Sequence, residues 1–324
     1  MKRSFPSRRW TLAFGLFISA ATAVFADVSI TLTNYHGWDG AYLLRNPVAE
    51  VLVVPSVGRV MQFRFAGESD GPLWENPTLL GKPMPEKPWD QPGSFGGDKT
   101  WPAPQSAWNW PPPDIFDAAP LTSEVNGQRL KLRSPTSARF GIRTERTIAL
   151  DSSSARLQII TRYDKVAGEP VEVGVWVITQ TQVPEAAFLP IPPKSLFPSG
   201  LSSMWENPEA AVIRLPGLIE FHRDSKVSRK IGNDSGSLAW VGKRWSLRID
   251  VGRDITARYP DDGCSAELYS NPDPTGYVEM ETLGPLHKLA VGQSLSATNV
   301  YTLSRRQEQD VAAEARRVLG IPGR

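Results

Sequence analysis

The chain has 324 residues, with 36 Lys and Arg against 34 Asp and Glu, which gives a formal net charge of +2. Four of the basic residues and no acidic residue lie in the first 26 positions, so the rest of the chain carries −2, which removes the electrostatic basis for binding nucleic acid. The single cysteine excludes an intrachain disulfide, and 29 prolines with 26 glycines indicate an all-β protein with long loops.

Residues 1–26 have the pattern of a cleavable secretory signal peptide. The segment opens with four basic residues, Lys2, Arg3, Arg8 and Arg9. The uncharged run Leu12–Phe25 that follows is too short to span a bilayer, and cleavage is expected after Ala26. The pattern predicts a periplasmic or secreted protein. Ser7–Leu12 also resembles a twin-arginine signal, so both export routes stay open. No later segment is apolar enough to cross a membrane, so the mature chain is predicted to have no membrane span.

Strand patterns with a two-residue alternation begin at Val28 and continue almost to the end of the chain. We expect strands at Val28–Asn34, Glu50–Pro55, Arg59–Phe65, Arg129–Ser134, Phe140–Leu150, Arg156–Tyr163, Val171–Gln180, Arg244–Asp250, Ala266–Ser270, Tyr277–Thr282 and Leu295–Leu303. Only Gln307–Leu319 has a helical period. No linker divides the chain, so the sequence predicts one domain at 27–305, followed by a C-terminal helix and tail at 306–324. The insert from about Gly67 to Pro120 is long enough to predict a functional loop.

The most unusual segment of this insert is Gly96–Pro113, which contains three tryptophans and five prolines. Its prolines argue against both a helix interior and a central strand. A sugar has an apolar C–H face that packs on indole rings and a hydroxyl rim that needs polar partners. The tryptophans of this segment can pack on the apolar face of a sugar. Asp98, Lys99 and Gln105 can bind its hydroxyl groups. The alternative is that the tryptophans only cap the sheet. The tryptophans are Trp101, Trp108 and Trp110.

A second candidate site lies on two neighbouring strands near the C terminus. Alternation places Val278 and Met280 on one face of their strand, and Tyr277, Glu279 and Glu281 on the other. Glu267 and Tyr269 share one face of the preceding strand. If Asn271–Thr275 closes a hairpin, we expect Glu267 opposite Glu279 and Tyr269 opposite Tyr277. Such close carboxylates raise each other's pKa towards that of a general base. The alternative is a solvated face neutralised by arginines.

The sequence lacks the motifs expected for metal binding, for serine hydrolysis and for phosphate binding. The three histidines, His36, His222 and His287, have no metal-ligand spacing. The sequence has neither a nucleophile elbow nor a glycine-rich phosphate loop followed by a helix. We therefore expect no metal and no cofactor.

Several motifs resemble an uncharacterised family, a domain of unknown function placed in the galactose mutarotase-like superfamily. The motifs are Gly96–Gln105, Trp176–Gln180, Lys230–Gly232 and Tyr259–Cys264. The likeness extends to about Leu303. It implies a galactose mutarotase-like β-supersandwich and a carbohydrate, either a mono- or an oligosaccharide, as the ligand. With the residues above, it implies a substrate-binding set of Trp101, Gln105, Trp108, Trp176, Gln180, Lys230, Glu267, Tyr269 and Glu279.

Two segments are similar to aldose 1-epimerases themselves, namely Pro260–Asn271 and Met280–Thr282. The likeness implies that Glu281 is the general base. In epimerases, the strand that resembles Val173–Gln180 carries the histidine that protonates the ring oxygen. Val173–Gln180 contains no histidine. A second epimerase histidine precedes a glycine pair, where this chain has Phe95.

These departures leave three functions open. The first is a sugar epimerase or mutarotase in which Glu281 is the base and another group is the acid. The candidates for the acid are Lys99, Asp98 and His36. The second is a non-catalytic periplasmic carbohydrate-binding protein, and the third is a protein related to polysaccharide lyases.

Overall fold

The computed structural model describes Met1 and residues 27–84, 94–202, 204–205, 212–272, 274 and 276–322. The predicted signal peptide therefore lies, apart from Met1, outside the described residues. No helix of the described part is long and apolar enough to span a bilayer.

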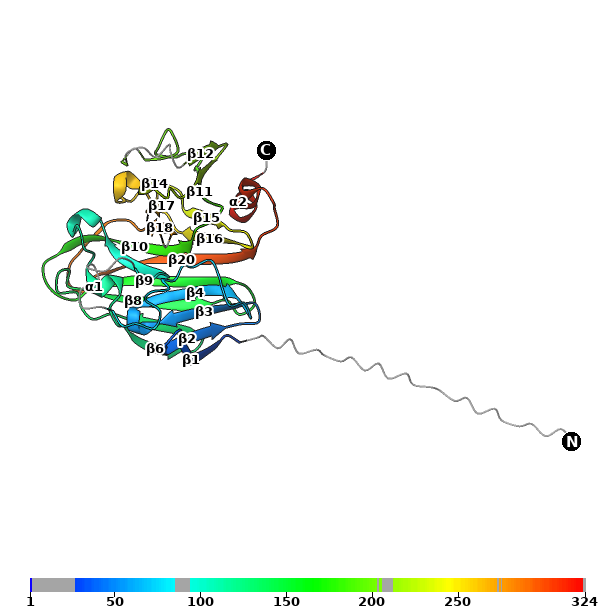
Figure 1. Cartoon of the computed structure of the whole chain (residues 1–324). Coiled ribbons are helices and arrows are strands. Elements are labelled where there is room, and N and C mark those ends of the chain that lie inside the picture. Colours follow the sequence, from blue (N-terminus) through cyan, green and yellow to red (C-terminus); the bar gives the residue numbers. More distant parts are fainter. Residues whose placement is uncertain are drawn as a thin grey trace.

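Two large antiparallel sheets form the molecule (Figure 1). Sheet 1 has the strand order β1 (Ser29–Tyr35), β2 (Trp38–Arg45), β3 (Ala49–Val54), β4 (Arg59–Phe65), β5 (Asp98–Ala103), β10 (Val171–Gln182), β18 (Tyr277–Leu283), β17 (Ala266–Ser270) and β14 (Arg229–Asn233), with β19 (His287–Leu289) also paired to β10. Sheet 2 has the order β12 (Val212–Leu215), β13 (Leu218–Phe221), β11 (Ala186–Pro190), β15 (Ser237–Val241), β16 (Trp245–Val251), β20 (Ser294–Arg305), β9 (Arg156–Lys165), β8 (Ile142–Leu150), β7 (Arg129–Arg133) and β6 (Thr122–Asn126).

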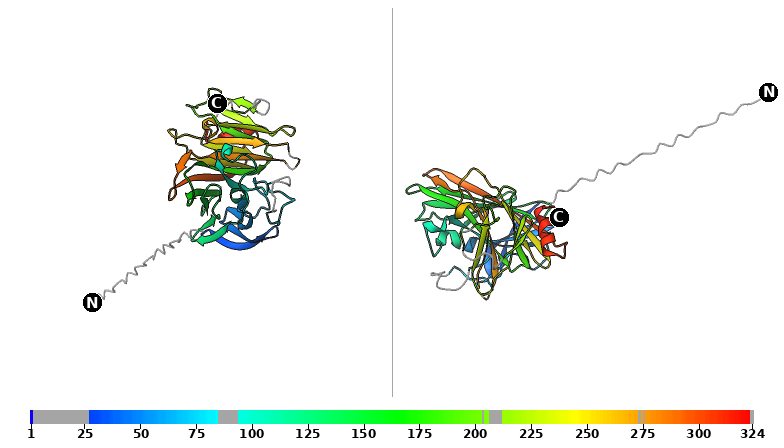
Figure 2. Two further views of the ribbon diagram at one scale, coloured as in Figure 1. Left: turned by 90° about the vertical axis from the view of Figure 1, so that its left-hand side faces the viewer. Right: turned by 90° about the horizontal axis from the view of Figure 1, so that it is seen from above.

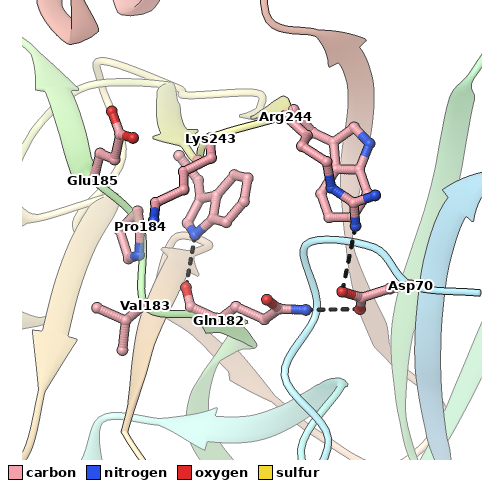
Figure 3. A pocket seen from close by; sticks show the side chains of 10 residues that line it. Asp70, Gln182, Val183, Pro184, Glu185, Lys243 and Arg244 are labelled. Carbon is pink, nitrogen blue, oxygen red and sulfur yellow. Dashed lines mark hydrogen bonds and ion pairs between the residues drawn. The ribbon is translucent and has the colours of Figure 1, made fainter.

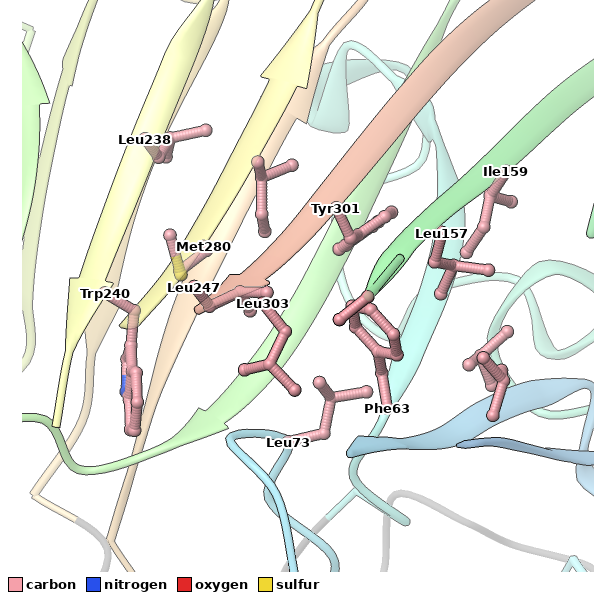
Figure 4. Packing of buried hydrophobic residues seen from close by; sticks show 14 of the residues in the cluster. Phe63, Leu73, Leu157, Ile159, Leu238, Trp240, Leu247, Met280, Tyr301 and Leu303 are labelled. Atoms are coloured by element: carbon pink, nitrogen blue, oxygen red, sulfur yellow. The ribbon is translucent and has the colours of Figure 1, made fainter. Parts of the chain in front are cut away.

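The inner faces of the two sheets enclose the main hydrophobic core (Figure 4). Met280 of sheet 1 packs in this core with Leu247 and Leu303 of sheet 2. Each such side chain stabilises the fold by about 1.5–3 kcal/mol through burial alone. Because side chains alternate along a strand, Glu279 and Glu281, on either side of Met280 in β18, point to the outer face of sheet 1. This is the alternation predicted for that strand.

The all-β prediction is confirmed, and each predicted strand overlaps an observed one. The C-terminal helix is also present as α2 (Val311–Leu319), where it packs Ala315 and Leu319 against sheet 2 at one side of the molecule (Figure 2). It begins at Val311 rather than Gln307 because the Asp310 side chain accepts a hydrogen bond from the Ala313 backbone N–H and caps the first turn.

The prediction that the Gly96–Pro113 segment contains no central strand is wrong. Strand β5 lies between β4 and β10, and Pro102 pairs with Val175. Two features allow this. First, β5 pairs with β4 only at Val60 and Asp98, so no partner lies beside Pro102 on that side. Second, the ladder bonds to β10 alternate, and Gln180 donates to the Gly97 carbonyl, so Pro102 falls at a position that needs no N–H.

The predicted hairpin between β17 and β18 forms with a different register. Glu267 lies opposite Glu281, and Tyr269 lies opposite Glu279, instead of the pairings Glu267 with Glu279 and Tyr269 with Tyr277. A shift of two residues keeps the same side chains on the same face, so the carboxylates still gather. The shift does change which two glutamates face each other.

Candidate functional site

Charged and amide side chains gather on the outer face of sheet 1, the face turned away from sheet 2. We call the outer-face cluster Lys99, Gln180, Lys230, Glu267, Glu279 and Glu281. The strand register forms it, since Lys99 is opposite Ile178, Ile178 is opposite Glu281, and Glu281 is opposite Glu267. Neighbouring strands lie about 4.8 Å apart, so the Cα atoms of Lys99 and Glu281 are separated by about 10 Å. The fold therefore brings the loop-side and strand-side candidates together.

Glu281 is held by two donors. Its Oε2 accepts hydrogen bonds from the Trp176 indole Nε1 at 2.7 Å and from Lys230 Nζ at 3.0 Å. Lys230 also lies 2.8 Å from Glu267 Oε2 and sits near the rings of Trp176 and Trp205, at 4.8 and 5.6 Å from their centroids. Burial alone lowers the pKa of Lys230, but the charges of Glu267 and Glu281 outweigh it and raise that pKa. The ammonium is therefore charged and stabilises negative charge on Glu281.

Glu267 is the most deeply buried carboxyl of the cluster. Its Oε2 forms the 2.8 Å ion pair with Lys230, and its Oε1 accepts no hydrogen bond from the described residues. Burial first, and then the charge of Glu281, raises the pKa of Glu267 well above its usual range, against the opposing effect of Lys230. Burial and the neighbouring Glu281 thus favour the protonated form of Glu267, whereas the Lys230 ammonium favours its ionised form.

Glu279 has different surroundings, although it is only two residues from Glu281 on the same face of β18. Its Oε1 accepts a 2.8 Å hydrogen bond from Gln180 Nε2. Burial, followed by the charge of Glu281, raises the pKa of Glu279 to about 7. Near neutral pH this carboxyl therefore exists in both the protonated and the ionised form, as an acid–base group requires.

Lys99 is paired with a residue that the sequence analysis missed. Its Nζ lies 2.8 Å from Oδ1 of Asp117, in the short helix α1 (Asp114–Asp117), and 4.2 Å from the ring centroid of Trp101. Asp117 also accepts hydrogen bonds from Trp101 Nε1 at 2.8 Å and from Arg59 at 3.0 Å. Burial, and then the charge of Arg59, lowers the pKa of Lys99. No sequence signal marked Arg59 or Asp117, because only the fold brings them together.

Asp98 does not belong to the site. It lies on the opposite face of β5 from Lys99, fully buried between the sheets. There it is paired with Arg146, and it accepts hydrogen bonds from Thr179 at 2.7 Å and Tyr301 at 2.5 Å. The catalytic role expected of Asp98 has no geometric basis. His36 contacts Glu75 at 3.9 Å in the β1–β2 turn and touches no cluster residue.

The tryptophans of the proline-rich segment have three different environments. Trp101 and Trp108 are buried and meet edge to face at 5.5 Å, and Trp108 donates to the Pro102 carbonyl at 2.7 Å. Trp108 therefore caps the sheet, which is the alternative expected for at least one of the three. Trp110 is 62% exposed. Gln105 is exposed and lies in the turn η2 (Gln105–Ala107).

Two aromatic groups border the cluster at opposite ends. Trp74 stacks on Tyr277, the first residue of β18, at 4.6 Å, and Trp205 lies over Lys230 of β14. Both tryptophans begin a Trp-Glu-Asn-Pro sequence. Between them, half-buried Tyr269 reaches Ser228 Oγ at 3.4 Å. The cluster is thus a charged strip between apolar walls, and the repeated tetrapeptide was a usable signal for those walls.

A pocket of about 360 Å³ lies nearby, where β10 ends (Figure 3). Several of its side chains already have partners: Gln182 donates to Asp70 at 2.8 Å, and Glu185 accepts from Arg306 at 2.6 Å. Its two indoles, of Trp240 and Trp245, are almost fully buried. The pocket offers no carboxyl comparable with those of the outer-face cluster. No group of three or more potential metal ligands was found in the described part of the chain.

The architecture defines a protein of two facing antiparallel sheets with a charged site on the outer face of one of them. It has a galactose mutarotase-like fold. A galactose mutarotase-like protein from Clostridium acetobutylicum superposes with a TM-score of 0.56 at 10% identity, over 86% of this chain and 99% of that one. A galactose mutarotase related enzyme from Lactobacillus acidophilus superposes with a TM-score of 0.52 at 10% identity, over 82% and 97%. No family model and no curated protein sequence matches the chain.

Proposed function

We propose that the chain binds an aldose at the outer-face cluster and interconverts its anomers. The observation that carries this proposal is the contrast between Glu279 and Glu281. Lys230 and Trp176 support negative charge on Glu281, whereas Glu279 has a pKa of about 7. Two carboxyls with different environments on one face are the usual basis for assigning a base and an acid. The names of the structural relatives support the choice of reaction.

The reaction needs one base and one acid, and the two glutamates supply both. Glu281 takes the proton of the sugar C1 hydroxyl, and the electron pair left behind forms the aldehyde. The bond between C1 and the ring oxygen breaks, and that oxygen takes the proton of Glu279. After rotation about C1–C2, the ring closes on the other face of the aldehyde, and both protons return. Glu279 thereby replaces the histidine that epimerases use, and neither Asp98 nor His36 is needed.

The charge balance favours a neutral sugar over a uronic acid. The three cations of the site are all paired: Lys230 with Glu267 and Glu281, and Lys99 and Arg59 with Asp117. A uronate would add another negative charge with no cation to meet it, which is unfavourable in a buried site. This argues against a lyase-type substrate.

A non-catalytic sugar-binding protein is the second candidate. It is favoured by one observation, namely that Glu281 is 1% exposed and both donors to it come from the protein itself. In such a protein Glu281 would organise the binding face without accepting a proton from the sugar. The two candidates share a ligand and differ only in the rate of exchange.

Export is part of the proposal and depends on the sequence alone, because residues 2–26 are not described. The basic start and apolar run support cleavage after Ala26. N-terminal sequencing of the protein from a periplasmic or secreted fraction is expected to begin at Asp27. A mature chain that begins at any residue other than Asp27 would contradict the predicted cleavage.

The test of function is NMR exchange spectroscopy between the anomers of glucose, galactose, mannose and xylose. Wild type is expected to accelerate exchange of at least one of them. Glu281→Gln is expected to lower that rate by about 10²–10⁴-fold, the usual contribution of an acid–base group, with little change in affinity. Glu124→Gln, on the exposed edge strand β6, is the matched control. If wild type binds a sugar but accelerates none, the catalytic proposal is wrong and the binding protein remains.

A further inference from the structure

Trp110 is the exposed end of a row of indoles that starts at the outer-face cluster. Among the large exposed hydrophobic side chains of the described residues, it is the only aromatic one. Exposed indoles are uncommon, because burying such a ring is strongly favourable. The exposure of the Trp110 indole is therefore a reason to look for a ligand at this position.

The row connects Trp110 to Glu281 through two intervening rings. The Trp176 indole donates to Glu281 at 2.7 Å. Trp176 meets Trp101 edge to face at 5.3 Å between ring centroids, and Trp101 meets Trp110 at 6.4 Å. Because Trp101 lies between the other two, one sugar ring at Glu281 does not reach Trp110. A ligand that contacts both must contain more than one sugar unit.

The segment that carries Trp110 is held in place. Arg139 donates to the carbonyls of Ala107 at 2.8 Å and Trp108 at 3.4 Å, and the Asn109 backbone N–H donates to Gln105 at 2.8 Å. The Trp108 indole anchors the same turn to β5, and three prolines follow Trp110. The indole is thus presented before any ligand arrives, which lowers the entropic cost of binding.

The surroundings of Trp110 fit a sugar better than a protein. The exposed residues near it along the chain are the polar Gln105, Ser106 and Asn109 and the small apolar Ala107 and Pro111, so no other large apolar side chain is exposed beside the ring. One apolar face with amide and hydroxyl groups beside it matches the C–H face and hydroxyl rim of a pyranose. A protein interface would need a much larger surface, of roughly 800 Å² on each partner.

We propose that Trp110 forms an outer subsite for the second or third unit of a reducing oligosaccharide, whose reducing end lies at Glu281. The proposal rests on the proposed function for the position of the reducing end. It narrows the ligand to oligosaccharides with a free anomeric centre.

The test compares Trp110→Ala, Trp110→Tyr and wild type by isothermal titration with glucose, galactose, lactose, maltotriose and cellotriose. For at least one oligosaccharide, Trp110→Ala is expected to weaken binding by about 3- to 10-fold, the loss of one aromatic contact. Trp110→Tyr is expected to keep most of the affinity. Monosaccharide affinity, which does not involve the outer subsite, is expected to change less than about twofold. Val291→Ala, at another exposed position, is the control.

The outcomes separate this proposal from the one on which it rests. If Trp110→Ala binds every oligosaccharide as tightly as wild type does, the outer subsite is wrong and the monosaccharide site stands. If mono- and oligosaccharides weaken equally, the loop acts on the whole site and the subsite is again wrong. Oligosaccharide binding that depends on Trp110, without accelerated anomer exchange, supports the subsite and rejects the catalysis. If wild type binds none of these sugars, both the outer subsite and the proposed function are wrong.

Discussion

The indole of Trp176 donates a 2.7 Å hydrogen bond to the carboxylate of Glu281, from one strand of sheet 1 to the next. The bond fixes the direction of a buried acid in the middle of the sheet. It also means that Trp176, expected from the sequence to touch a ligand, acts first on Glu281. A sugar at this site would meet an already oriented carboxylate.

Trp176→Phe keeps an aromatic ring but removes the pyrrole part of the indole with its N–H donor. We expect a loss of about 1.5–3 kcal/mol in the free energy of unfolding, since the acceptor is charged. Trp108→Phe is the matched comparison, because its indole donates to the neutral Pro102 carbonyl and is expected to cost about 0.5–1.5 kcal/mol. Urea denaturation at pH 7 measures both. Equal losses would indicate that Glu281 is not ionised there.

Lys230→Met keeps most of the apolar length of the side chain and removes the ammonium that Glu267 and Glu281 share. Two buried carboxyls are left without a cation, so we expect a loss of about 3–5 kcal/mol at pH 8. The loss is expected to shrink as the pH falls. Glu267 has a raised pKa in the folded state, so it takes up a proton and no longer needs the cation. Unfolding at pH 5 and pH 8 measures this. Lys230→Met/Glu267→Gln is expected to recover part of the stability, and a pH-independent loss would contradict the explanation.

Glu279 makes a separate contribution to the pH dependence of stability, which falls as the pH rises. Its pKa is about 7 in the folded state against 4.5 ordinarily, so the folded state binds the extra proton between these values. Stability from this group is therefore full below about pH 4.5 and falls as the pH rises to about 7, by about 3 kcal/mol in total. Relative to wild type, Glu279→Gln should gain stability by that amount between pH 5 and pH 8. A difference that is constant with pH would show that Glu279 titrates normally.

The sequence predicted the parts of this site that depend on alternation within a strand. The faces of Val278, Glu279, Met280 and Glu281 follow from a two-residue period and needed no knowledge of neighbours. Contacts between distant segments could not be predicted in this way. Asp117 reaches Lys99 only because α1 packs beside β5, and the β17–β18 register depends on a turn whose conformation the sequence leaves open.

The proline-rich segment shows the same limit. Composition indicated a rigid, tryptophan-rich segment but did not predict which ring is exposed. Trp108 is buried and donates a hydrogen bond to the Pro102 carbonyl, whereas Trp110, two residues later, is exposed to solvent. Pro102 was also misleading, because a strand that lacks a partner on one side tolerates a missing N–H.

The placement of Asp98 between the sheets gives the last prediction. Its carboxylate is paired with Arg146 and accepts hydrogen bonds from Thr179 and Tyr301, so it acts as a buried structural anion. Tyr301→Phe removes one donor and is expected to cost about 1.5–3 kcal/mol of unfolding free energy, because the acceptor is charged. Asp98→Asn leaves the Arg146 guanidinium buried without its counter-charge and is expected to cost about 3–5 kcal/mol. Sugar affinity, measured by titration on the variant that stays folded, is expected to match wild type, because Asp98 and Lys99 lie on opposite faces of β5. If Tyr301→Phe kept its stability but lost sugar binding, Asp98 would have to reach the ligand, and the separation of the two faces would be wrong.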